Sequence, residues 1–274
     1  MLQRVKKDTN STIPAPDPQA VDRIAYIRYD GDGSKPGDRP VVREVPWTIH
    51  VNGHELVTLF CTPGKLNYLV LGFLAAEGLI ESLDDVLLLQ VCEDQEGVID
   101  VTLNGQGPSP SGRPILLSGC GRGITFDDLS GNYPKIESSL QVSMDQLSRL
   151  MREIRNRAPI HQAAGGTHAS ALSDGNQLLV LAEDVGRHNT LDKIRGECLF
   201  HGIPTKDRLL LTTGRVSSEM VTKAVKMEVP IVASRSTPTD LAIKLARDWQ
   251  MTIVGYVRAR KMNIYSRPDR IATH

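Results

Sequence analysis

The second half of the chain alternates short apolar runs with amphipathic segments, and this pattern constrains the fold more than any other feature. The runs predict strands at 178–182, 208–213, 229–233 and 251–257. Helical periodicity follows each of the first three runs. Strands that alternate with helices at this spacing are typical of βαβ units in a parallel sheet. We therefore expect an α/β domain over residues 136–274.

Polar turns follow the predicted strands at 183–188, 213–218, 234–237 and 257–262. In open α/β sheets, ligands bind beyond the carboxyl ends of the strands, where helix N-termini offer N–H groups to phosphate and arginine adds bidentate contacts. One such turn alone would be an ordinary helix cap with a solvated arginine. Several on one edge favour a site for a large phosphorylated ligand. The predicted ligand residues are Arg187, His188, Gly214, Arg215, Val257, Arg258, Ala259, Arg260, Lys261 and Met262.

The composition limits the classes of function. Lys and Arg total 32 and balance 32 Asp and Glu, which argues against a general polyanion binder. Aromatic residues make up 4%, too few for a platform that stacks single-stranded nucleic acid. No apolar run approaches the roughly 18 residues of a membrane span, and the polar N-terminus lacks the apolar core of a signal peptide. We expect a soluble cytoplasmic protein that binds neither nucleic acid nor membrane.

Cys120 stands between two glycines, after the apolar run 115–117 and two residues before Arg122. Flanking glycines favour the tip of a loop, and a neighbouring guanidinium favours the reactive thiolate. The alternative is a tight turn in which Cys120 is a small buried hydrophobe. The stretch alone leaves both interpretations open. The other cysteines are Cys61, Cys92 and Cys198, and the four together lack the spacing of a zinc site or a disulfide framework.

The first half predicts a flexible tail at 1–21 and a smaller α+β domain at 22–135. Two alternating runs within 47–60 meet at Asn52-Gly53, which is a strong hairpin signal. An apolar helix over 65–78 ends at Gly78, where a C-terminal glycine is expected. The remaining predictions are strands at 25–29, 86–91 and 98–103, and a turn-rich loop at 31–40.

Two helix starts are predicted from capping residues in the second half. Ser143 and Gln146 form a capping box. Thr237 is expected to cap another helix, with Pro238 at its first position and Asp240 at its third.

His168 belongs to a His-Ala motif that we expect before a helix, an arrangement seen in zinc deaminases. Ser170 stands where the deaminase glutamate should be, and the later Pro-Cys-x-x-Cys is absent. The sequence therefore predicts no hydrolytic zinc site. His168 and His188 could bind ligand or exchange a proton with Cys120, or each could be a structural hydrogen-bonding residue.

These segments closely resemble the formate dehydrogenase accessory sulfurtransferases, the FdhD/NarQ family, from about residue 44 to the C-terminus. The matching residues are Cys61-Thr-Pro-Gly64, Leu71-Gly-Phe73, Glu77-Gly78, Gly119-Cys120-Gly121, Gly166-Thr-His168-Ala169, Glu183-Asp-Val-Gly-Arg-His188, Leu191-Asp-Lys193, Arg215, Ser217, Glu219-Met220, Lys223, Val254-Gly255 and the residues up to Tyr265.

The resemblance implies a sulfur carrier with a cytidine-deaminase-like α/β domain, commonly a homodimer. Cys120 would accept sulfur from a cysteine desulfurase as a persulfide. The sulfur would pass to the molybdenum or tungsten of a bis-molybdopterin guanine dinucleotide, held at 257–262, before this cofactor enters formate dehydrogenase. A chaperone that binds the cofactor without sulfur chemistry is the alternative, and a deaminase-like hydrolase is a weaker one.

Two departures from the family pattern concern the mechanism. Many members have a second cysteine in the loop, whereas this chain has Gly123, so an internal disulfide between loop cysteines is not available. The segment 258–261 is also more basic than the usual glycine-containing turn, so details of base recognition do not transfer.

Overall fold

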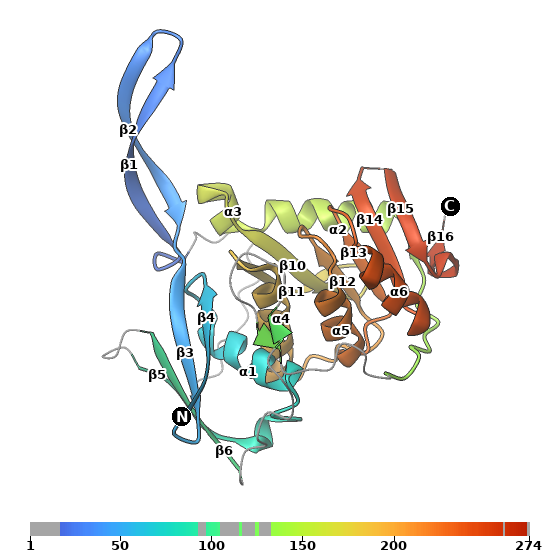
Figure 1. Cartoon of the computed structure of the whole chain (residues 1–274). Helices are drawn as coiled ribbons and strands as arrows, with labels where there is room; N and C mark the ends of the chain where they lie inside the picture. The colour runs from blue at the N-terminus through green and yellow to red at the C-terminus, as the bar shows by residue number, and fades with distance from the viewer. Residues whose placement is uncertain are drawn as a thin grey trace.

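The computed structural model describes residues 17–92, 97–104, 115–116, 124–125, 133–259 and 261–272. Its largest element is a six-stranded sheet with the order β11-β10-β12-β13-β14-β15 (Figure 1). The strands are β10 (His168–Ser173), β11 (Leu178–Asp184), β12 (Leu209–Thr212), β13 (Ile231–Ser234), β14 (Thr252–Arg258) and β15 (Lys261–Ser266).

This sheet is mixed, so the prediction of a parallel sheet is correct only for its centre. Strands β12, β13 and β14 run parallel, as predicted from the alternation. Strand β10 pairs antiparallel with β11 and with β12, and β15 pairs antiparallel with β14. The connections from β10 to β11 and from β14 to β15 are only a few residues long. Such short connections can make hairpins but cannot hold the crossover that parallel neighbours need.

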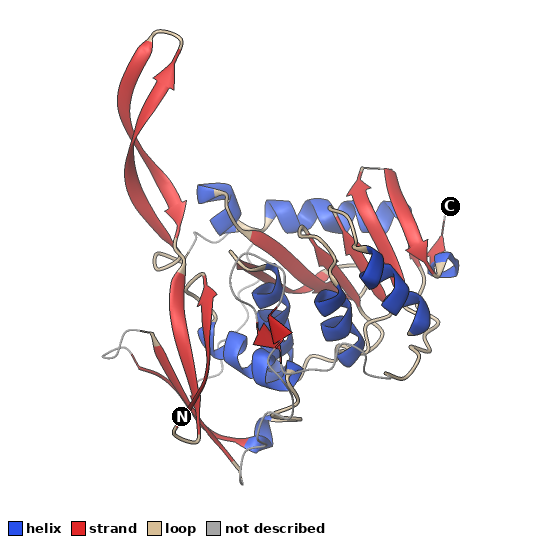
Figure 2. Ribbon diagram, in the orientation of Figure 1, coloured by secondary structure: helices blue, strands red, loops and turns tan. Residues whose placement is uncertain are grey.

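Helices cover both faces of the sheet (Figure 2). Helix α2 (Met144–Asn156) packs on one face, while α4 (Arg187–His201), α5 (Ser218–Lys226) and α6 (Asp240–Asp248) pack on the other. Adjacent strand residues therefore enter opposite cores: Leu209 and Leu211 contact the α2 side, and Leu210 the α4 side. Burial on both faces explains why these strands are continuously apolar.

The helix starts depend on capping side chains. The predicted capping box is confirmed, because the Ser143 side chain accepts from the N–H of Gln146 and the Gln146 side chain accepts from the N–H of Ser143. The predicted cap of α6 is wrong by two residues. Thr239 is the N-cap, and residues 237–239 stay extended because Val216 N donates to Thr237 O and Thr239 N donates to Val216 O.

A second, four-stranded sheet has the order β4-β3-β6-β5. Its strands are β3 (Val45–Val51), β4 (His54–Cys61), β5 (Val86–Cys92) and β6 (Val98–Leu103), with the 3-10 turn Leu83–Asp85 before β5. The predicted hairpin is confirmed: Asn52 and Gly53 both have positive φ, 51° and 79°, as a primed two-residue turn requires. The division of the chain at residue 135 stays a prediction.

Helix α1 (Leu66–Ala76) covers the small sheet and crosses α4 of the larger one. Gly78, with φ of 73°, follows the end of α1, as predicted. The two helices meet at Gly72 and Gly196. A Cβ on Gly72 would lie 1.8 Å from Asp192 O, and one on Gly196 would lie 1.9 Å from Tyr68 O. Only glycine permits this backbone contact.

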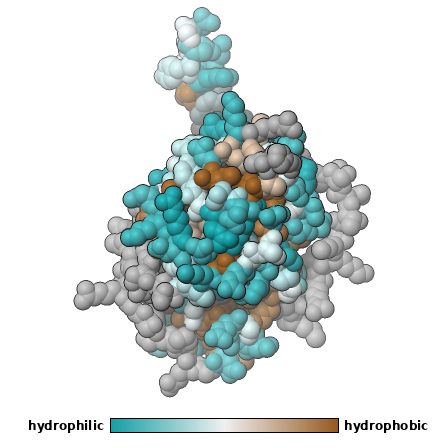
Figure 3. Space-filling view, turned by 90° about the vertical axis from the view of Figure 1, so that its right-hand side faces the viewer, coloured by the Kyte–Doolittle hydropathy of each residue, from teal (hydrophilic) through white to brown (hydrophobic). Residues whose placement is uncertain are grey.

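Residues 21–42 form an antiparallel ribbon of β1 (Val21–Asp30) and β2 (Gly33–Val42), which corrects the predicted loop at 31–40. The ribbon extends away from the rest of the molecule (Figures 1 and 3). Prolines and glycines in β2 suggested a loop. A two-stranded ribbon accepts them because each strand has a side without a partner strand. At the base of the ribbon, Arg39 donates to Ala164 O at the end of α3 (Pro159–Ala164).

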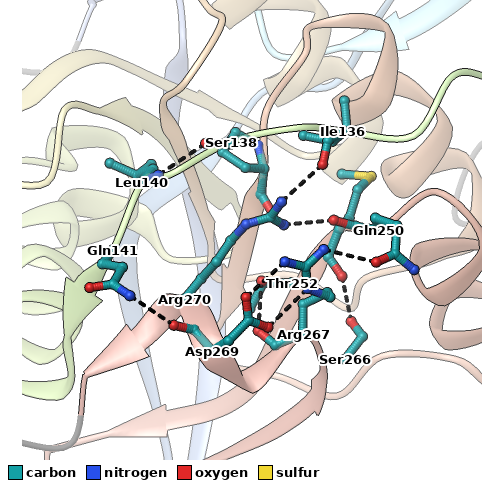
Figure 4. A network of polar contacts seen from close by, with 12 residues as sticks. Ile136, Ser138, Leu140, Gln141, Gln250, Thr252, Ser266, Arg267, Asp269 and Arg270 are labelled. Atoms are coloured by element: carbon teal, nitrogen blue, oxygen red, sulfur yellow. Dashed lines mark hydrogen bonds and ion pairs between the residues drawn. The ribbon is translucent and has the colours of Figure 1, made fainter.

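The C-terminal strand is fixed to the sheet by the buried Arg270 (Figure 4). Its guanidinium donates to the carbonyl oxygens of Pro230, Gln250 and Ile136. Strand β16 (Ile271–Ala272), after the 3-10 turn Pro268–Arg270, then pairs in parallel with β9 (Val142–Ser143). Within the ranges given above, no helix has the length and apolar character needed to cross a membrane.

Candidate functional site

The carboxyl ends of β12, β13 and β14 lie together, as predicted, and their turns are tied by hydrogen bonds. Ser234 Oγ donates to Gly214 O at 2.6 Å, and Arg235 N donates to Thr212 O at 3.0 Å. Tyr256 N donates to Ser236 O at 2.9 Å. Helices α4, α5 and α6 begin at this same edge.

Gly214 brings two of the predicted side chains together. A Cβ at Gly214 would lie 3.1 Å from Arg187 Cβ and 3.3 Å from His168 Nδ1, so the three residues are in contact. Burial lowers the pKa of His168, and the charges of Arg187 and His188 lower it further. His168 is therefore a mainly neutral imidazole beside a guanidinium at pH 7. This pair can offer an anion one positive charge and one neutral hydrogen-bonding group.

The environment of His168 differs from that predicted. His168 begins strand β10 and does not precede a helix. Ser170 is buried, and its hydroxyl lies 2.7 Å from Thr190 Oγ1 and 2.9 Å from Thr212 Oγ1. Its polar neighbours are thus hydroxyl groups that fasten β10 to β12 and α4. No cluster of three or more His, Cys, Asp or Glu residues suited to a metal is present in the part of the chain that the structure describes.

One ring nitrogen of His188 lies close to two oxygen atoms. Nε2 lies 3.0 Å from Ser217 Oγ and 2.9 Å from Glu219 Oε2. A Ser–His–acid triad needs the serine and the acid on opposite ring nitrogens, so this arrangement is not a hydrolase triad. Burial raises the pKa of Glu219, but the hydrogen bond from His188 and the charge of Lys223 outweigh burial and leave the pKa below its ordinary value.

The two acids of the 183–188 turn have structural roles. Glu183 accepts from the N–H groups of Ile160 and His161, at the start of α3. Asp184 is fully buried and lies 2.7 Å from Lys193 Nζ. Asp184 also accepts from Thr62 N, and Lys193 donates to Thr62 O. These contacts join the small sheet to α4.

Four arginines surround a hollow beside the end of β14, which we call the arginine hollow. Arg152 and Arg155 come from α2, Arg235 follows β13, and Arg258 ends β14. The remaining lining residues are Ser148, Met151, Val257 and Ala259, so none of the described residues that line the hollow is acidic. Its volume of about 210 Å³ is below the range of roughly 300–1,000 Å³ for pockets that enclose a whole ligand. It suits one anionic group of a larger molecule.

The predicted ligand residues are only partly gathered at this hollow. Val257, Arg258 and Ala259 line it, and Ser148 Oγ donates to Ala259 O. Met262 packs instead against the core on the α2 side, while Lys261 and Arg215 are exposed. Arg187, His168 and Gly214 form the separate cluster described above. Arg260 lies outside the described residues.

Arg152 and Arg155 were not predicted from the sequence. Their spacing of three residues places both on one face of α2, away from the buried Leu147, Leu150 and Ile154. This spacing is a signal, but a basic helix face is usually only solvated. This face differs from an ordinary basic face because the end of β14 lies opposite it. That neighbour can be identified only when the order of the strands in the sheet is known.

The segment that contains Cys120 lies between β7 (Ile115–Leu116) and β8 (Ile124–Thr125), which pair antiparallel. Cys120 itself lies outside the described residues. Cys61 and Cys198 are buried, and burial raises the pKa of each thiol to about 12. Neither can act as a readily ionised second thiol in the folded protein.

Comparisons with known proteins agree with these observations. The model of the FdhD/NarQ family matches residues 42–272. Proteins named sulfur carrier protein FdhD are 39% identical over 236 residues in Bacillus pumilus (84% of this chain, 90% of that protein) and 37% identical over 251 residues in Bacillus subtilis (89% and 95%).

A crystal structure described as that of a formate dehydrogenase accessory protein, from Desulfotalea psychrophila, superposes with a TM-score of 0.76 at 25% identity. The match covers 92% of this chain and all of that one. The mixed α/β architecture is thus shared, while the likeness to cytidine deaminases stays a prediction. On the family match and the identity of its relatives, the chain belongs to the FdhD/NarQ family.

Proposed function

We propose that this protein is a sulfur carrier that acts for formate dehydrogenase through a persulfide on Cys120. The observation that carries the proposal is the sequence Gly119-Cys120-Gly121, which falls in the chain between the paired strands β7 and β8. Relatives 37–39% identical over most of the chain are named sulfur carrier proteins. The buried Cys61 and Cys198 are poor alternatives because their thiols resist ionisation.

In the first step, the Cys120 thiolate attacks the outer sulfur of a persulfide on a cysteine desulfurase. A new S–S bond forms at Cys120, the donor's S–S bond breaks, and the donor cysteine leaves as a thiolate. No net oxidation or reduction takes place. Arg122 is close in sequence and can favour the anionic forms of Cys120 before and after this exchange.

The sulfur acceptor is a bis-molybdopterin guanine dinucleotide that carries molybdenum or tungsten, bound as substrate. Its phosphate groups would contact the arginine hollow and the exposed basic residues of 258–261, and the hollow has the charge and volume for one such group. The His168–Arg187 pair at the same sheet edge is a second place for an anionic group. Transfer then requires that the metal end of the substrate held here reach Cys120, a proximity effect.

In the second step, the sulfane sulfur moves from Cys120 to the metal. The S–S bond breaks, Cys120 leaves as a thiolate, and two electrons from the metal reduce the sulfur to sulfide. This balance consumes no second thiol, so Gly123 at the position of the second family cysteine is compatible with transfer. We further propose that the reaction takes place in the cytoplasm and that the protein acts as a homodimer.

The test is production of formate dehydrogenase in cells that have only this sulfur carrier. The Cys120→Ala variant should yield inactive dehydrogenase at normal protein levels, and Cys92→Ser should retain activity. Full activity with Cys120→Ala would reject sulfur transfer through this residue. It would favour the alternative, in which the protein is a chaperone that binds the cofactor without sulfur chemistry.

A further inference from the structure

A separate cavity lies between the C-terminal ends of α4 and α5, away from the carboxyl edge of the large sheet where both helices begin. Its walls come from the last two turns of α4, the connection 202–205 toward β12, and residues 226 and 227 at the end of α5. Its volume is about 360 Å³, within the range of roughly 300–1,000 Å³ for pockets that enclose a small ligand. The sulfur transfer proposed above makes no use of this cavity.

Two cations line the cavity, and among the described residues that line it none is acidic. Lys226 is already engaged, because its Nζ donates to Ala76 O at the end of α1 and lies 5.9 Å from the centre of the Tyr133 ring. Arg195 differs from Lys226. Its Nη1 is buried, yet it has no hydrogen-bond partner among the described residues. A buried donor without an acceptor is rare in folded proteins and often marks a place for a bound ion or water.

The charge of Arg195 is also incompletely balanced within the protein. Burial lowers the pKa of Arg195, although the charges of Asp192, Tyr133 and Glu77 favour its protonated form. Asp192 has the largest of these opposing effects, but both of its carboxylate oxygens lie 2.6 Å from Lys223 Nζ. That carboxylate is therefore already paired with another cation. An anion beside Arg195 would accept a hydrogen bond from Nη1 and balance the guanidinium charge.

The shape and lining of the cavity restrict the kind of anion. A guanidinium presents parallel N–H groups that match the two oxygens of a carboxylate. Much of the remaining wall is apolar and includes Leu199, Ile203 and Met227. An inorganic anion would match the charge but would leave this wall without a contact. A carboxylate that carries a short hydrocarbon chain satisfies both parts of the cavity.

We propose that this cavity is a binding site for a short-chain monocarboxylate. The carboxylate accepts hydrogen bonds from Arg195, and the hydrocarbon chain packs against the apolar wall formed by Leu199, Ile203 and Met227. The site shares no residue with the arginine hollow, with the His168–Arg187 pair or with the Cys120 segment. It is therefore independent of the proposed sulfur transfer.

Titration with sodium butyrate, followed by nuclear magnetic resonance, tests the site directly. The protein is labelled with ¹³C in its methionine methyl groups, and Met227→Leu identifies the Met227 signal among the seven methionines. At constant ionic strength, butyrate should shift this signal until it saturates. Butyramide has the same shape without the charge and should leave the signal in place. No saturable shift with butyrate, or an equal shift with butyramide, would overturn the proposal.

The length of the ligand tests the contact with the apolar wall. Butyrate has two more CH₂ groups than acetate, and burying them should make butyrate bind about tenfold more tightly. Equal affinity for acetate and butyrate would show that the chain makes no contact with the wall, which would overturn the proposed class of ligand.

Arg195→Gln tests the guanidinium and should weaken butyrate binding at least tenfold, since a hydrogen bond to a charged group is lost. Lys206→Gln is the matched control. Lys206 is a cation beside the cavity residue Thr205, but it does not line the cavity and forms an exposed ion pair with Glu228. Unchanged signals from the other methionines would confirm that both variants fold. Equal butyrate affinity in Arg195→Gln and Lys206→Gln would overturn the proposal.

Discussion

Arg152 and Arg155 show how single residues determine the charge of the arginine hollow. Both face the arginine hollow from α2, together with Arg235 and Arg258, in a chain with no net charge. Among the residues that the structure describes, no acid lines the hollow with them. Their mutual repulsion is relieved when an anion binds, and screening by salt should weaken that binding.

Replacing both α2 arginines, as Arg152→Gln with Arg155→Gln, should weaken binding of guanosine diphosphate at least tenfold. A hydrogen bond to a charged group is worth about 1.5–3 kcal/mol, and about 1.4 kcal/mol is a factor of ten. Arg149→Gln is the matched control, because Arg149 lies on the same helix but faces Glu153 and Gly175 O. Calorimetry would contradict this role if the double variant bound as tightly as the control.

The His168 imidazole predicts a dependence of stability on pH. Its folded pKa is lowered by burial and by Arg187, so near and below pH 6.5 the unfolded chain binds more protons than the folded one. The free energy of unfolding should therefore rise as the pH is raised from 5 to 7. Thermal melts of His168→Gln should show a smaller rise than wild type, with His54→Gln as a control for loss of an exposed histidine. An identical rise in all three would reject this origin.

At the residue scale, sequence reasoning located the carboxyl edge but could not divide its residues by role. Arg258 and Arg187 were expected to serve one ligand site, and the structure places them in two separate groups. Glu183 and Asp184, in the same turn as Arg187, instead accept hydrogen bonds from backbone N–H groups. Such roles depend on contacts between residues far apart in the sequence, such as Thr62 with Asp184. Local sequence patterns carry no information on these contacts.

Among the elements, the crossing of α1 and α4 is the most constrained contact. The backbones touch at Gly72 and Gly196, where any Cβ would overlap a carbonyl oxygen. In an isolated helix, replacing glycine by alanine stabilises by about 1 kcal/mol. Here the sign should reverse because the helices would have to separate.

Gly196→Ala is therefore expected to destabilise the protein by roughly 1–3 kcal/mol, the usual cost of overpacking a core. Urea denaturation followed by circular dichroism measures the change. A stabilised variant would mean that the helices separate easily, and it would contradict the close crossing.

The sequence predicted most elements because their signals are local. The hairpin at Asn52-Gly53, the end of α1 at Gly78 and the capping box at Ser143 each depend on a few neighbouring residues. The β1–β2 ribbon was missed because prolines in β2 are acceptable only on an unpaired edge. Strands β10 and β15 were missed because the His-Ala motif was expected to precede a helix and because residues 257–262 were expected to be a polar turn after the last strand.

On the scale of the whole molecule, a buried ion pair joins the two sheets. Lys193 and Asp184 are 2.7 Å apart, almost fully buried, and both bond to the backbone of Thr62 at the end of the small sheet. Removing one partner of a buried pair leaves the other charge without compensation, at a cost of about 3–5 kcal/mol.

Lys193→Met should lower the free energy of unfolding of the whole chain by an amount in that range, which appears as a lower urea midpoint. Trp47 reports on the small sheet and Trp249 on the large one, so fluorescence of Trp47→Phe and Trp249→Phe backgrounds follows each separately. Both should report the same lower midpoint.

Lys65→Met, which removes a more exposed ion pair with Glu197, should cost no more than about 1 kcal/mol. Equal effects of the two substitutions would contradict a special role for Lys193.

The central claim is that Cys120 carries sulfur, and intact mass spectrometry tests it most directly. The purified protein is incubated with a cysteine desulfurase and cysteine, then weighed before and after reduction with a thiol. Wild type and Cys92→Ser should gain the mass of one sulfur atom, which reduction removes, whereas Cys120→Ala should gain none. The same gain in Cys120→Ala, or no gain in wild type, would contradict the account.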